Sequence, residues 1–465
     1  MQGNPVIVWL RRDLRLVDQA AFFAAAARGP VIPVFVLDDE RAGARKPGGA
    51  SRWWLHHSLE ALAADLARHN SRLILRRGDC VEHLCQIAEE TGAHEVHALR
   101  HYEPWWRDAT SALADKLDLV LHDGNYLLPP GSLTTASGGA YKIYTPFAKA
   151  ARQHLPQRDP LPAPNLTPHE RWPASDNLTA WGLRPARSDW ASGLREMWQA
   201  GSHAAQERLA VFLHKAEAYE DQRNLPGVDG TSRLSPHLHW GEISPGQVWA
   251  ALERVRGCGA DTFRGELLWR DYAQNVILQF PDYSEASYRD GFGSDFWRRP
   301  DLDGGVETDL TAWQQGRTGY PIVDAGMREL WHTGWMHNRV RMITASFLVK
   351  HLLIDWRVGE RWFWDTLVDA DYANNGVNWQ WVAGSGVDAN MFTRIMAPLS
   401  QSEKFDAAAY IRQWVPELAN LDDAAIHDPP PLLRPSGYPD MLVSHREGRE
   451  RALQAYRAMK ADICV

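Results

Sequence analysis

The order of secondary-structure patterns constrains the fold of this chain most. The first 125 residues alternate between short runs of β-branched residues and longer stretches with helical spacing, such as Ser51–Arg68 and Cys80–Thr91. Such alternation predicts a parallel sheet covered by helices, with ligands beyond the carboxyl ends of the strands. Neither a GxGxxG after the first strand nor a GxxxxGK[ST] motif is present, which excludes the usual dinucleotide fingerprint and a P-loop. The expected strands are Val6–Leu10, Val31–Leu37, Arg72–Leu75, Glu95–Leu99 and Leu119–His122.

The composition changes after residue 128. Ten of the 28 prolines lie between residues 129 and 185, which predicts a long irregular connection over the surface. From about Gly193 onward the patterns are helical. We therefore expect an N-terminal parallel-sheet α/β (Rossmann-like) domain over 1–128, a Pro-rich linker over 129–192 and an all-helical domain over 193–465. The expected helices of the last part are Ala204–Gln222, Asp261–Phe280, Ile322–Thr333, Trp335–Leu353 and Glu360–Val368.

Charge and cysteine content limit the function classes. The 465 residues carry 50 Lys+Arg and 58 Asp+Glu, a net charge of −8, which excludes a globally basic nucleic-acid coat but not a local basic groove. The four cysteines show no CxxC spacing, so we expect no disulfide scaffold and no cysteine metal site. No apolar run approaches a membrane span, and no signal peptide is apparent. We expect a cytoplasmic protein. The cysteines are Cys80, Cys85, Cys258 and Cys464.

Tryptophan is unusually abundant, at 22 of 465 residues, and seven of the 22 lie between Trp331 and Trp381. Arginine and lysine are interleaved with these rings. Basic and aromatic residues together suit a surface that holds backbone phosphates and stacks bases. A solvated helix face is the alternative interpretation.

Three further segments carry candidate chemistry. Glu266, Trp269 and Arg270 share one helix face, which indicates either a site or an amphipathic helix with an internal ion pair. The segment Asp369–Trp381 holds two acids and three amides, which are costly in a core unless they bind a polar ligand. A surface loop is the alternative for this segment. The hydroxyl-rich stretch Thr231–Ser235 is able to hydrogen-bond a phosphate.

These segments resemble the cryptochrome–photolyase family, and within it the bacterial cyclobutane pyrimidine dimer (CPD) photolyases. The likeness extends from about Val6 to Leu418. Asp369–Trp381 is similar to the flavin-contacting loop of the family, and Thr231–Ser235 to its FAD-phosphate segment. The other matching motifs are Val6–Arg15, Thr318–Asp324, Gly334–Arg339 and Arg341–Ser346.

The resemblance implies light-driven DNA repair. The cofactor would be FAD in its reduced form, and the partner would be UV-damaged DNA, with the dimer flipped out of the duplex. A monomer without metal or membrane contact is expected. The residues that would hold FAD are Tyr219, Thr231, Ser232, Arg233, Leu234, Ser235, Asn338, Arg341, Asp369, Asp371 and Asn375.

The same resemblance assigns the reaction pocket. Glu266 would hydrogen-bond the dimer, Asn375 would face flavin N5, and Trp269, Met342 and Trp381 would line the pocket. The residues that would contact DNA are Arg223, Trp269, Arg270, Asn338, Arg339 and Gln401.

Electron transfer and light harvesting involve other tryptophans. Trp379 nearest the flavin, then Trp356, then Trp297 at the surface would form the family's relay for FAD photoreduction, although each also suits a plain core position. A second chromophore would stack on Trp53 and Trp54 or on Trp105 and Trp106, which could equally pack a domain surface. Methenyltetrahydrofolate is favoured over a deazaflavin.

Three alternative functions stay open. A (6-4) photolyase needs a histidine pair at the pocket, whereas Asn338 follows His337 here. A signalling cryptochrome would keep FAD and the tryptophan relay but could lose the dimer contacts. A flavin oxidoreductase unrelated to light is the third.

Overall fold

The chain forms two compact units. The computed structural model describes residues 4–156, 158–186, 189–389 and 391–463. Unit 1 comprises residues 1–220 and 232–281, and unit 2 comprises 221–231 and 282–465. This division by compactness differs from the expected division at residues 128 and 192, because the helices up to residue 281 group with the sheet.

A five-stranded parallel sheet is the centre of unit 1. The strand order is β3-β2-β1-β4-β5, so the chain winds outward from β1 in one direction and then reverses to add β4 and β5 on the other side. Ile7 pairs with Ile32 and Val6 pairs with Glu95, which fixes the register of the three central strands. The expected parallel α/β fold is confirmed. The strands are β1 Val6–Leu10, β2 Val31–Leu37, β3 Ile74–Arg77, β4 Glu95–Leu99 and β5 Asp118–His122.

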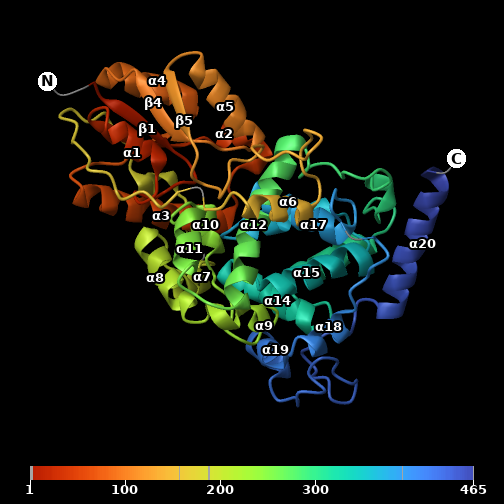
Figure 1. Ribbon diagram of the computed structural model, residues 1–465. Coiled ribbons are helices and arrows are strands. Elements are labelled where there is room, and N and C mark those ends of the chain that lie inside the picture. The colour runs from red at the N-terminus through yellow and green to blue at the C-terminus, as the bar shows by residue number, and fades with distance from the viewer. Residues whose placement is uncertain (1–3, 157, 187–188, 390, 464–465) are drawn as a thin grey trace. The chain divides into compact units, whose positions relative to one another are not determined.

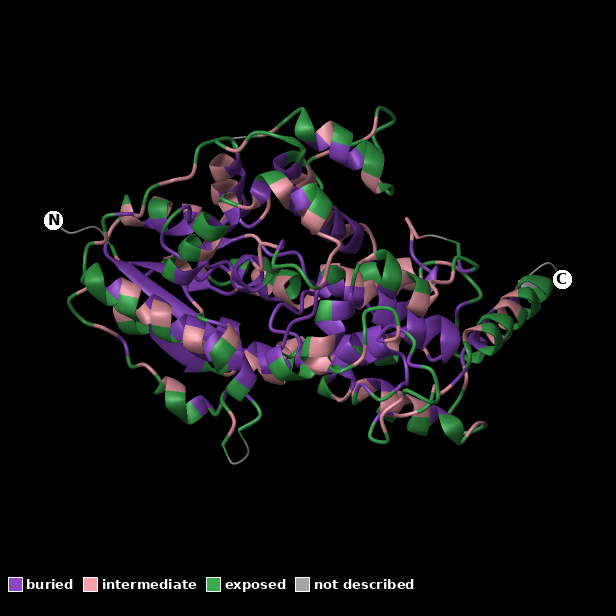
Figure 2. Cartoon of the chain, turned by 90° about the horizontal axis from the view of Figure 1, so that it is seen from below, coloured by how far each residue is buried: buried purple, intermediate pink, exposed green. Residues whose placement is uncertain are grey.

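Helices cover both faces of this sheet (Figure 1). Helices α4 and α5 bury Leu84, Ile87 and Leu113 against the face that carries Ile7 and Trp9. Helix α1 packs on β1, β2, β4 and β5. Strands β1 and β2 are buried along their whole length, as expected for a sheet with two covered faces (Figure 2). The helices before residue 128 are α1 Ala20–Ala26, α2 Asp39–Ala42, α3 Gly49–Arg68, α4 Cys80–Thr91 and α5 Pro104–Ala114.

The expected linker is not wholly irregular. It contains the helix α6, Tyr144–Arg152, and a 3-10 turn, η2, Leu178–Trp181. Phe147, Ala148 and Ala151 form the buried face of α6, which packs against α12. The other helices of unit 1 are α7 Ser192–Met197, α8 Ser202–Leu213, α10 Ser235–His239, α11 Pro245–Leu252 and α12 Cys258–Gln279, with α9 Tyr219–Gln222 ending in unit 2.

Unit 2 is helical around one large apolar core that includes Trp313, Phe347 and Trp356. Helices α16 and α17 approach closely at Gly359, where a Cβ would lie 2.3 Å from the ring of Trp379. The helices are α13 Gly305–Gln314, α14 Pro321–Thr333, α15 Asn338–Ser346, α16 Trp356–Thr366, α17 Tyr372–Ala383, α18 Pro398–Lys404, α19 Ala408–Trp414 and α20 His445–Ile463.

Three expected segments of unit 2 need correction. The helix expected over Trp335–Leu353 begins only at Asn338, because His337 caps it, and it continues as a π-helical segment, η5, Phe347–His351. The helix expected from Glu360 begins at Trp356, capped by Asp355. The stretch compared with a flavin-contacting loop is largely helix α17, capped by Asp371. A side-chain acceptor at the N-cap explains each start.

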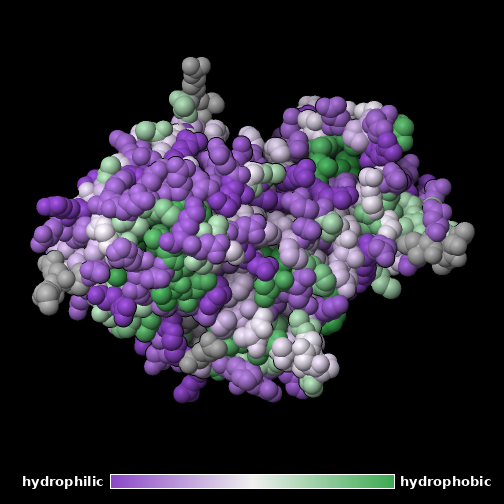
Figure 3. Space-filling view, turned by 90° about the horizontal axis from the view of Figure 1, so that it is seen from above, coloured by the Kyte–Doolittle hydropathy of each residue, from purple (hydrophilic) through white to green (hydrophobic). Residues whose placement is uncertain are grey.

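Surface and cysteine features are consistent with the composition. None of the described helices is both long enough and apolar enough to cross a membrane. The face drawn in Figure 3 is mainly hydrophilic, with small apolar patches. Cys80, Cys85 and Cys258 are free thiols, and Cys464 lies outside the described residues. Within the described ranges, no group of three or more His, Cys, Asp or Glu residues is arranged to hold a metal ion.

Candidate photochemical and DNA-binding site

The strand ends of unit 1 carry a cluster of buried charges rather than an open site. Ligands on doubly wound sheets bind where the winding direction reverses, which here is between β1 and β4. Arg12 pairs with Glu103 at this point, and Asp13 accepts a hydrogen bond from the backbone N–H of Arg11 at 2.6 Å. Burial lowers the pKa of His101 to about 3. We call Arg11, Arg12, Asp13, His101 and Glu103 the switch-point cluster, and it occupies the expected ligand position itself.

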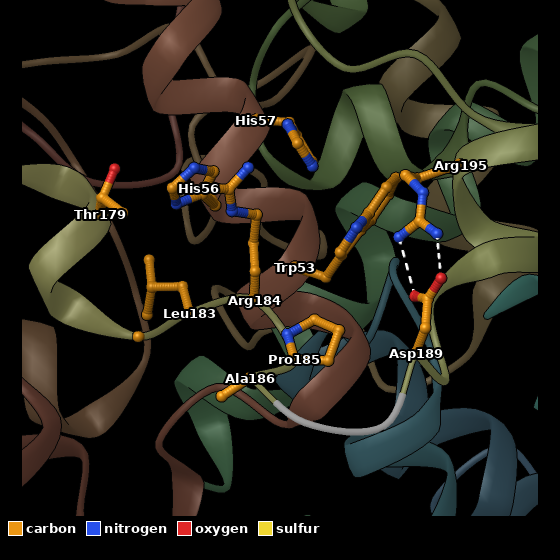
Figure 4. A pocket seen from close by; sticks show the side chains of 11 residues that line it. Trp53, His56, His57, Thr179, Leu183, Arg184, Pro185, Ala186, Asp189 and Arg195 are labelled. Carbon is orange, nitrogen blue, oxygen red and sulfur yellow. Dashed lines mark hydrogen bonds and ion pairs between the residues drawn. The ribbon is translucent and has the colours of Figure 1, made fainter.

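A cavity of about 500 Å³ lies elsewhere in unit 1, between α3 and the segment that follows η2 (Figure 4). Trp53 and His57 supply its aromatic lining, with their ring centroids 4.7 Å apart. Arg195 is paired with Asp189, whereas Arg184 has no ion-pair partner among the described residues. The cavity therefore combines aromatic walls with an uncompensated cation.

The other antenna candidates have structural contacts. Trp54 is fully buried, donates to Glu242 Oε1 at 3.0 Å and packs edge-on against Trp198. Trp106 packs edge-on against Trp9, with centroids 6.0 Å apart. Neither these residues nor Trp105 line the cavity, so Trp53 is the antenna candidate that the cavity supports.

The predicted stripe on α12 is half-buried. Trp269 stacks face to face on Tyr144 of α6, with ring centroids 3.4 Å apart and planes 6° apart. Glu266 lies one turn away on the same helix. Arg270, predicted to contact DNA, instead donates to the carbonyl oxygens of Asn125 and Leu238 and lies over the Tyr126 ring. These contacts hold the guanidinium within unit 1, and the role of Arg270 in DNA contact stays a prediction.

The expected FAD-phosphate segment lies across the division between the units, with Thr231 in unit 2 and the residues after it in unit 1. Arg233 has a positive φ of 51°, and the Ser232 hydroxyl accepts from the N–H of Leu234 at 3.2 Å. Ser235 begins α10. The ring of Tyr219 packs against Phe212 and Phe263. The segment thus forms a turn whose backbone conformation is uncommon for a non-glycine residue.

In unit 2 the predicted residues converge. A cavity of about 100 Å³ lies between α15, α16 and α17, and we call it the helical pocket. Asn374 and Asn378 also line it. Both belong to the amide-rich segment singled out in the sequence, but neither had been assigned a role. The predicted residues that line it are Asn338, Arg341, Met342, Asp369, Asp371, Asn375, Trp379 and Trp381.

Polar contacts orient the groups in the helical pocket. Arg341 donates to both oxygens of Asp369, at 3.1 and 2.9 Å, in a bidentate pair. Asp371 has a different role, because its Oδ1 accepts from the backbone and side-chain amides of Asn374, both at 2.8 Å. Asp371 thereby caps α17 and fixes the helix that carries the other pocket residues.

The amide of Asn375 has a defined orientation. Its Nδ2 group donates to the backbone oxygen of Glu360 at 3.1 Å and to Glu360 Oε1 at 2.8 Å. The carbonyl oxygen is the atom that Asn375 retains as an acceptor. Sequence reasoning missed Glu360, although an acid among the buried aromatic positions Trp356 and Phe363 of an amphipathic helix is a usable signal.

Two predicted DNA contacts lie together in unit 2. Arg339 donates to Asn224 Oδ1 at 2.7 Å and its guanidinium lies 4.6 Å from the ring centroid of Phe405. Burial, and then the nearby positive charge of Arg223, lower the pKa of Arg339. Gln401 lies on α18, one turn before Phe405. Arg223 and Arg339 therefore form a local positive pair on a negatively charged protein.

The three relay candidates lie in one apolar core. Trp379 lines the helical pocket and contacts Trp313 edge-on at 6.4 Å, and Trp356 donates to Ser287 at 3.0 Å. The expectation that Trp297 lies at the surface is wrong, because only 4% of it is exposed. Phe292 and Phe296 pack against its ring, whereas the surface position had been implied only by the family resemblance.

The groups in the helical pocket fit a flavin. Carboxylates, amide oxygens and a guanidinium match the donors and acceptors of a flavin ring and its ribityl chain, and Trp379 supplies an adjacent aromatic face. Within the described residues, the helical pocket places polar groups and an aromatic ring around the oriented amide of Asn375.

Comparison with known proteins agrees with this chemistry. The family described as DNA photolyase matches residues 6–165, and the FAD binding domain of DNA photolyase matches residues 263–458. A deoxyribodipyrimidine photo-lyase of Agrobacterium fabrum is 44% identical and covers 99% of each chain.

Solved structures agree as well. A bacterial class III photolyase from Agrobacterium tumefaciens, 44% identical, superposes with a TM-score of 0.93 over 99% of this chain and 98% of that chain. An archaeal photolyase from Sulfolobus tokodaii, solved with two FAD molecules, is 28% identical and has a TM-score of 0.83 over 98% of this chain and 100% of that chain. From its full-length relatives and its FAD binding domain, this chain belongs to the DNA photolyase family.

Proposed function

We propose that this protein is a CPD photolyase, a carbon–carbon lyase that uses light to split cyclobutane pyrimidine dimers in UV-damaged DNA. The observation that carries the proposal is the convergence of flavin-type and base-type partners in the helical pocket. The name of the 44% identical relative supports the same reaction. When bound, reduced FAD supplies a photoexcited electron donor, and the electron returns after ring opening, so the net redox change is zero.

The pocket residues hold and tune the flavin. Arg341 and Asp369 form a preorganised pair that would hold the ribityl chain, and Asp371 fixes α17. Asn375 offers a carbonyl oxygen, which favours a flavin nitrogen that carries a proton over one that does not. The expected contacts of Tyr219 and of Thr231, Ser232, Arg233, Leu234 and Ser235 with the remainder of FAD belong to the same proposal.

Glu266, Trp269, Met342 and Trp381 act on the dimer. Glu266 hydrogen-bonds the pyrimidine and stabilises the charge that develops on it, while the indoles stack on the flat, apolar base pair. Asn338 contacts the dimer as well, and Arg223, Arg339 and Gln401 hold the phosphate backbone. Binding then falls steeply as salt is raised, because counterions are released.

For the antenna we propose methenyltetrahydrofolate in the cavity around Trp53. The indole would stack on the pterin, and Arg184 would pair with a glutamate carboxylate, a charge that a deazaflavin ring system lacks. Reconstitution with the folate tests this part. We expect an added absorption band that Trp53→Ala and Arg184→Ala remove; equal occupancy by a deazaflavin in both variants contradicts it.

Repair is tested by incubating the reduced protein with a CPD-containing oligonucleotide in blue light and in darkness. We expect monomeric pyrimidines in light alone. Without light-dependent repair, but with intact FAD photoreduction, the cryptochrome alternative gains support. Repair of a (6-4) photoproduct instead of a CPD indicates the other photolyase class.

Two variants test individual roles. Glu266→Ala lowers the repair yield while FAD stays bound, and the exposed Glu89→Ala serves as its control. Trp379→Phe blocks photoreduction of oxidised FAD without abolishing repair by enzyme that is reduced chemically. Unchanged photoreduction removes Trp379 from the relay, in which Trp356 and Trp297 are the proposed further carriers.

The proposal includes a cytoplasmic monomer. The free thiols of Cys80, Cys85 and Cys258 suit a reducing compartment. Light scattering on a size-exclusion column measures the oligomeric state.

A further inference from the structure

The aromatic rings that pack against Trp269 come from the linker and from α12 itself. Tyr144, at the start of α6, stacks on Trp269 with centroids 3.4 Å apart, and Tyr272 packs edge-on against both rings. A full face-to-face stack is not the arrangement that aromatic pairs prefer by themselves. Other contacts must therefore hold these rings in register.

Two phenol hydrogen bonds supply that restraint. The Tyr144 hydroxyl donates to the carbonyl oxygen of Gly265 at 2.9 Å, and the Tyr272 hydroxyl donates to the carbonyl oxygen of Lys142 at 2.7 Å. The linker thus bonds to α12 through Tyr144, and α12 bonds to the linker through Tyr272. Gly265 immediately precedes Glu266, so the same contact restrains both predicted dimer-binding residues of α12.

We propose that Tyr144 is a positioning residue for damage recognition. It covers one face of the Trp269 indole and fixes its plane, so that Trp269 presents a single, preorganised face to a flipped pyrimidine dimer. This inference rests on the proposed function. A ring held in its bound orientation binds more tightly because less side-chain freedom is lost.

The measurement is the ratio of dissociation constants for undamaged and CPD-containing oligonucleotides, taken in darkness. Tyr144→Leu should lower this ratio about three- to tenfold, the range that aromatic stacking provides. FAD occupancy and photoreduction should be unchanged. Tyr144→Phe keeps the ring but loses the hydrogen bond to Gly265, so the ratio should fall by less than in Tyr144→Leu.

A matched control lies one turn along α6. Phe147 is buried and contacts Tyr272 and Tyr141. Phe147→Leu disturbs α6 packing to a similar degree but leaves the Tyr144 stack in place, so the ratio should not change. An equal loss in both variants overturns the proposal in favour of general packing.

A double-mutant cycle isolates the action through Trp269. In a Trp269→Leu background, Tyr144→Leu should produce no further loss, because the ring that it positions is absent. Additive losses overturn the inference. If Tyr144→Leu fails to fold, Tyr144→Met carries the same test, since a flexible thioether fills space without holding a plane. A wild type without CPD preference or light-dependent repair contradicts the proposed function, whereas a wild type with both and an unaffected Tyr144→Leu contradicts only this inference.

Discussion

Two buried polar regions, the switch-point cluster of unit 1 and the helical pocket of unit 2, use the same residue types to different ends. In the cluster, Glu103 and Asp13 are fully buried and are paired with groups of the protein itself. In the pocket, Asp369 is paired, but the amide of Asn375 is turned by Glu360 so that its oxygen is retained for another partner. Buried charge therefore marks a ligand site only where it borders a cavity.

The largest effect is expected from Glu103→Ala in the switch-point cluster. The variant removes a fully buried carboxylate from its ion pair with Arg12, whose side chain is only 12% exposed, which should lower the free energy of unfolding by about 3–5 kcal/mol. Urea denaturation measures the change, with Glu89→Ala as the surface control. A loss of stability below about 1 kcal/mol would show that the switch-point cluster is not structural, which contradicts its contrast with the helical pocket.

Asp271→Asn tests a buried acid that belongs to neither region. Burial raises the pKa of Asp271 from 3.8 to about 7. Because the folded value lies above the unfolded one, the stabilising proton is present at low pH and is lost as pH rises through 7.

Asparagine keeps an oxygen for the N–H of Leu128, which the acid accepts at 3.0 Å, but it does not titrate. Relative to wild type, the variant should therefore gain about 2–3 kcal/mol of stability between pH 5 and pH 8, at about 1.4 kcal/mol per pKa unit. Urea unfolding at four pH values measures this; parallel profiles contradict the assignment.

Asp369→Ala sharpens the pocket side of the comparison. The side chain of Arg341 is 23% exposed, so loss of its partner should cost only about 1–2 kcal/mol of stability. FAD affinity should fall at least about tenfold, measured by fluorescence titration. The exposed Asp365→Ala is the control. A large loss of stability with unchanged FAD affinity would show that the helical pocket, like the switch-point cluster, has a structural role.

The smallest effect is expected from Arg28→Ala. Arg28 forms an exposed ion pair with Glu95 at 3.2 Å, and such pairs contribute less than about 1 kcal/mol. The difference should diminish further in high salt. A salt-insensitive loss of the size expected for Glu103→Ala would show that burial does not separate these pairs.

Sequence patterns predicted the buried elements well. Val6–Leu10, Val31–Leu37 and Cys80–Thr91 have the expected bounds, because their apolar residues face a core at strand or helix spacing. The predicted residues of the helical pocket could be placed only through a family resemblance, since spacing within one helix does not show which helices meet.

The structural features that the sequence patterns did not predict have specific physical causes. Helix α17 contains Asn374, Asn375 and Gly376, which favour turns, yet it forms because Asp371 caps it and Gly376 allows close approach to Ser284. Helix α6 lies in a proline-rich stretch and gains its stability from tertiary packing. The stack of Tyr144 on Trp269 joins residues 125 positions apart, which no local pattern records.

The attachment of the linker to α12 has a consequence for protein engineering. Leu128, Gly131, Tyr141 and Lys142 each bond through their backbone to a side chain of α12, over a span of two turns. A chimera whose exchange point lies after α6 would separate these partners and combine a foreign linker with the native helix α12. Exchange points before Leu128 keep residues 128–142 and α12 from one parent, and should give the higher yield of folded, flavin-loaded protein.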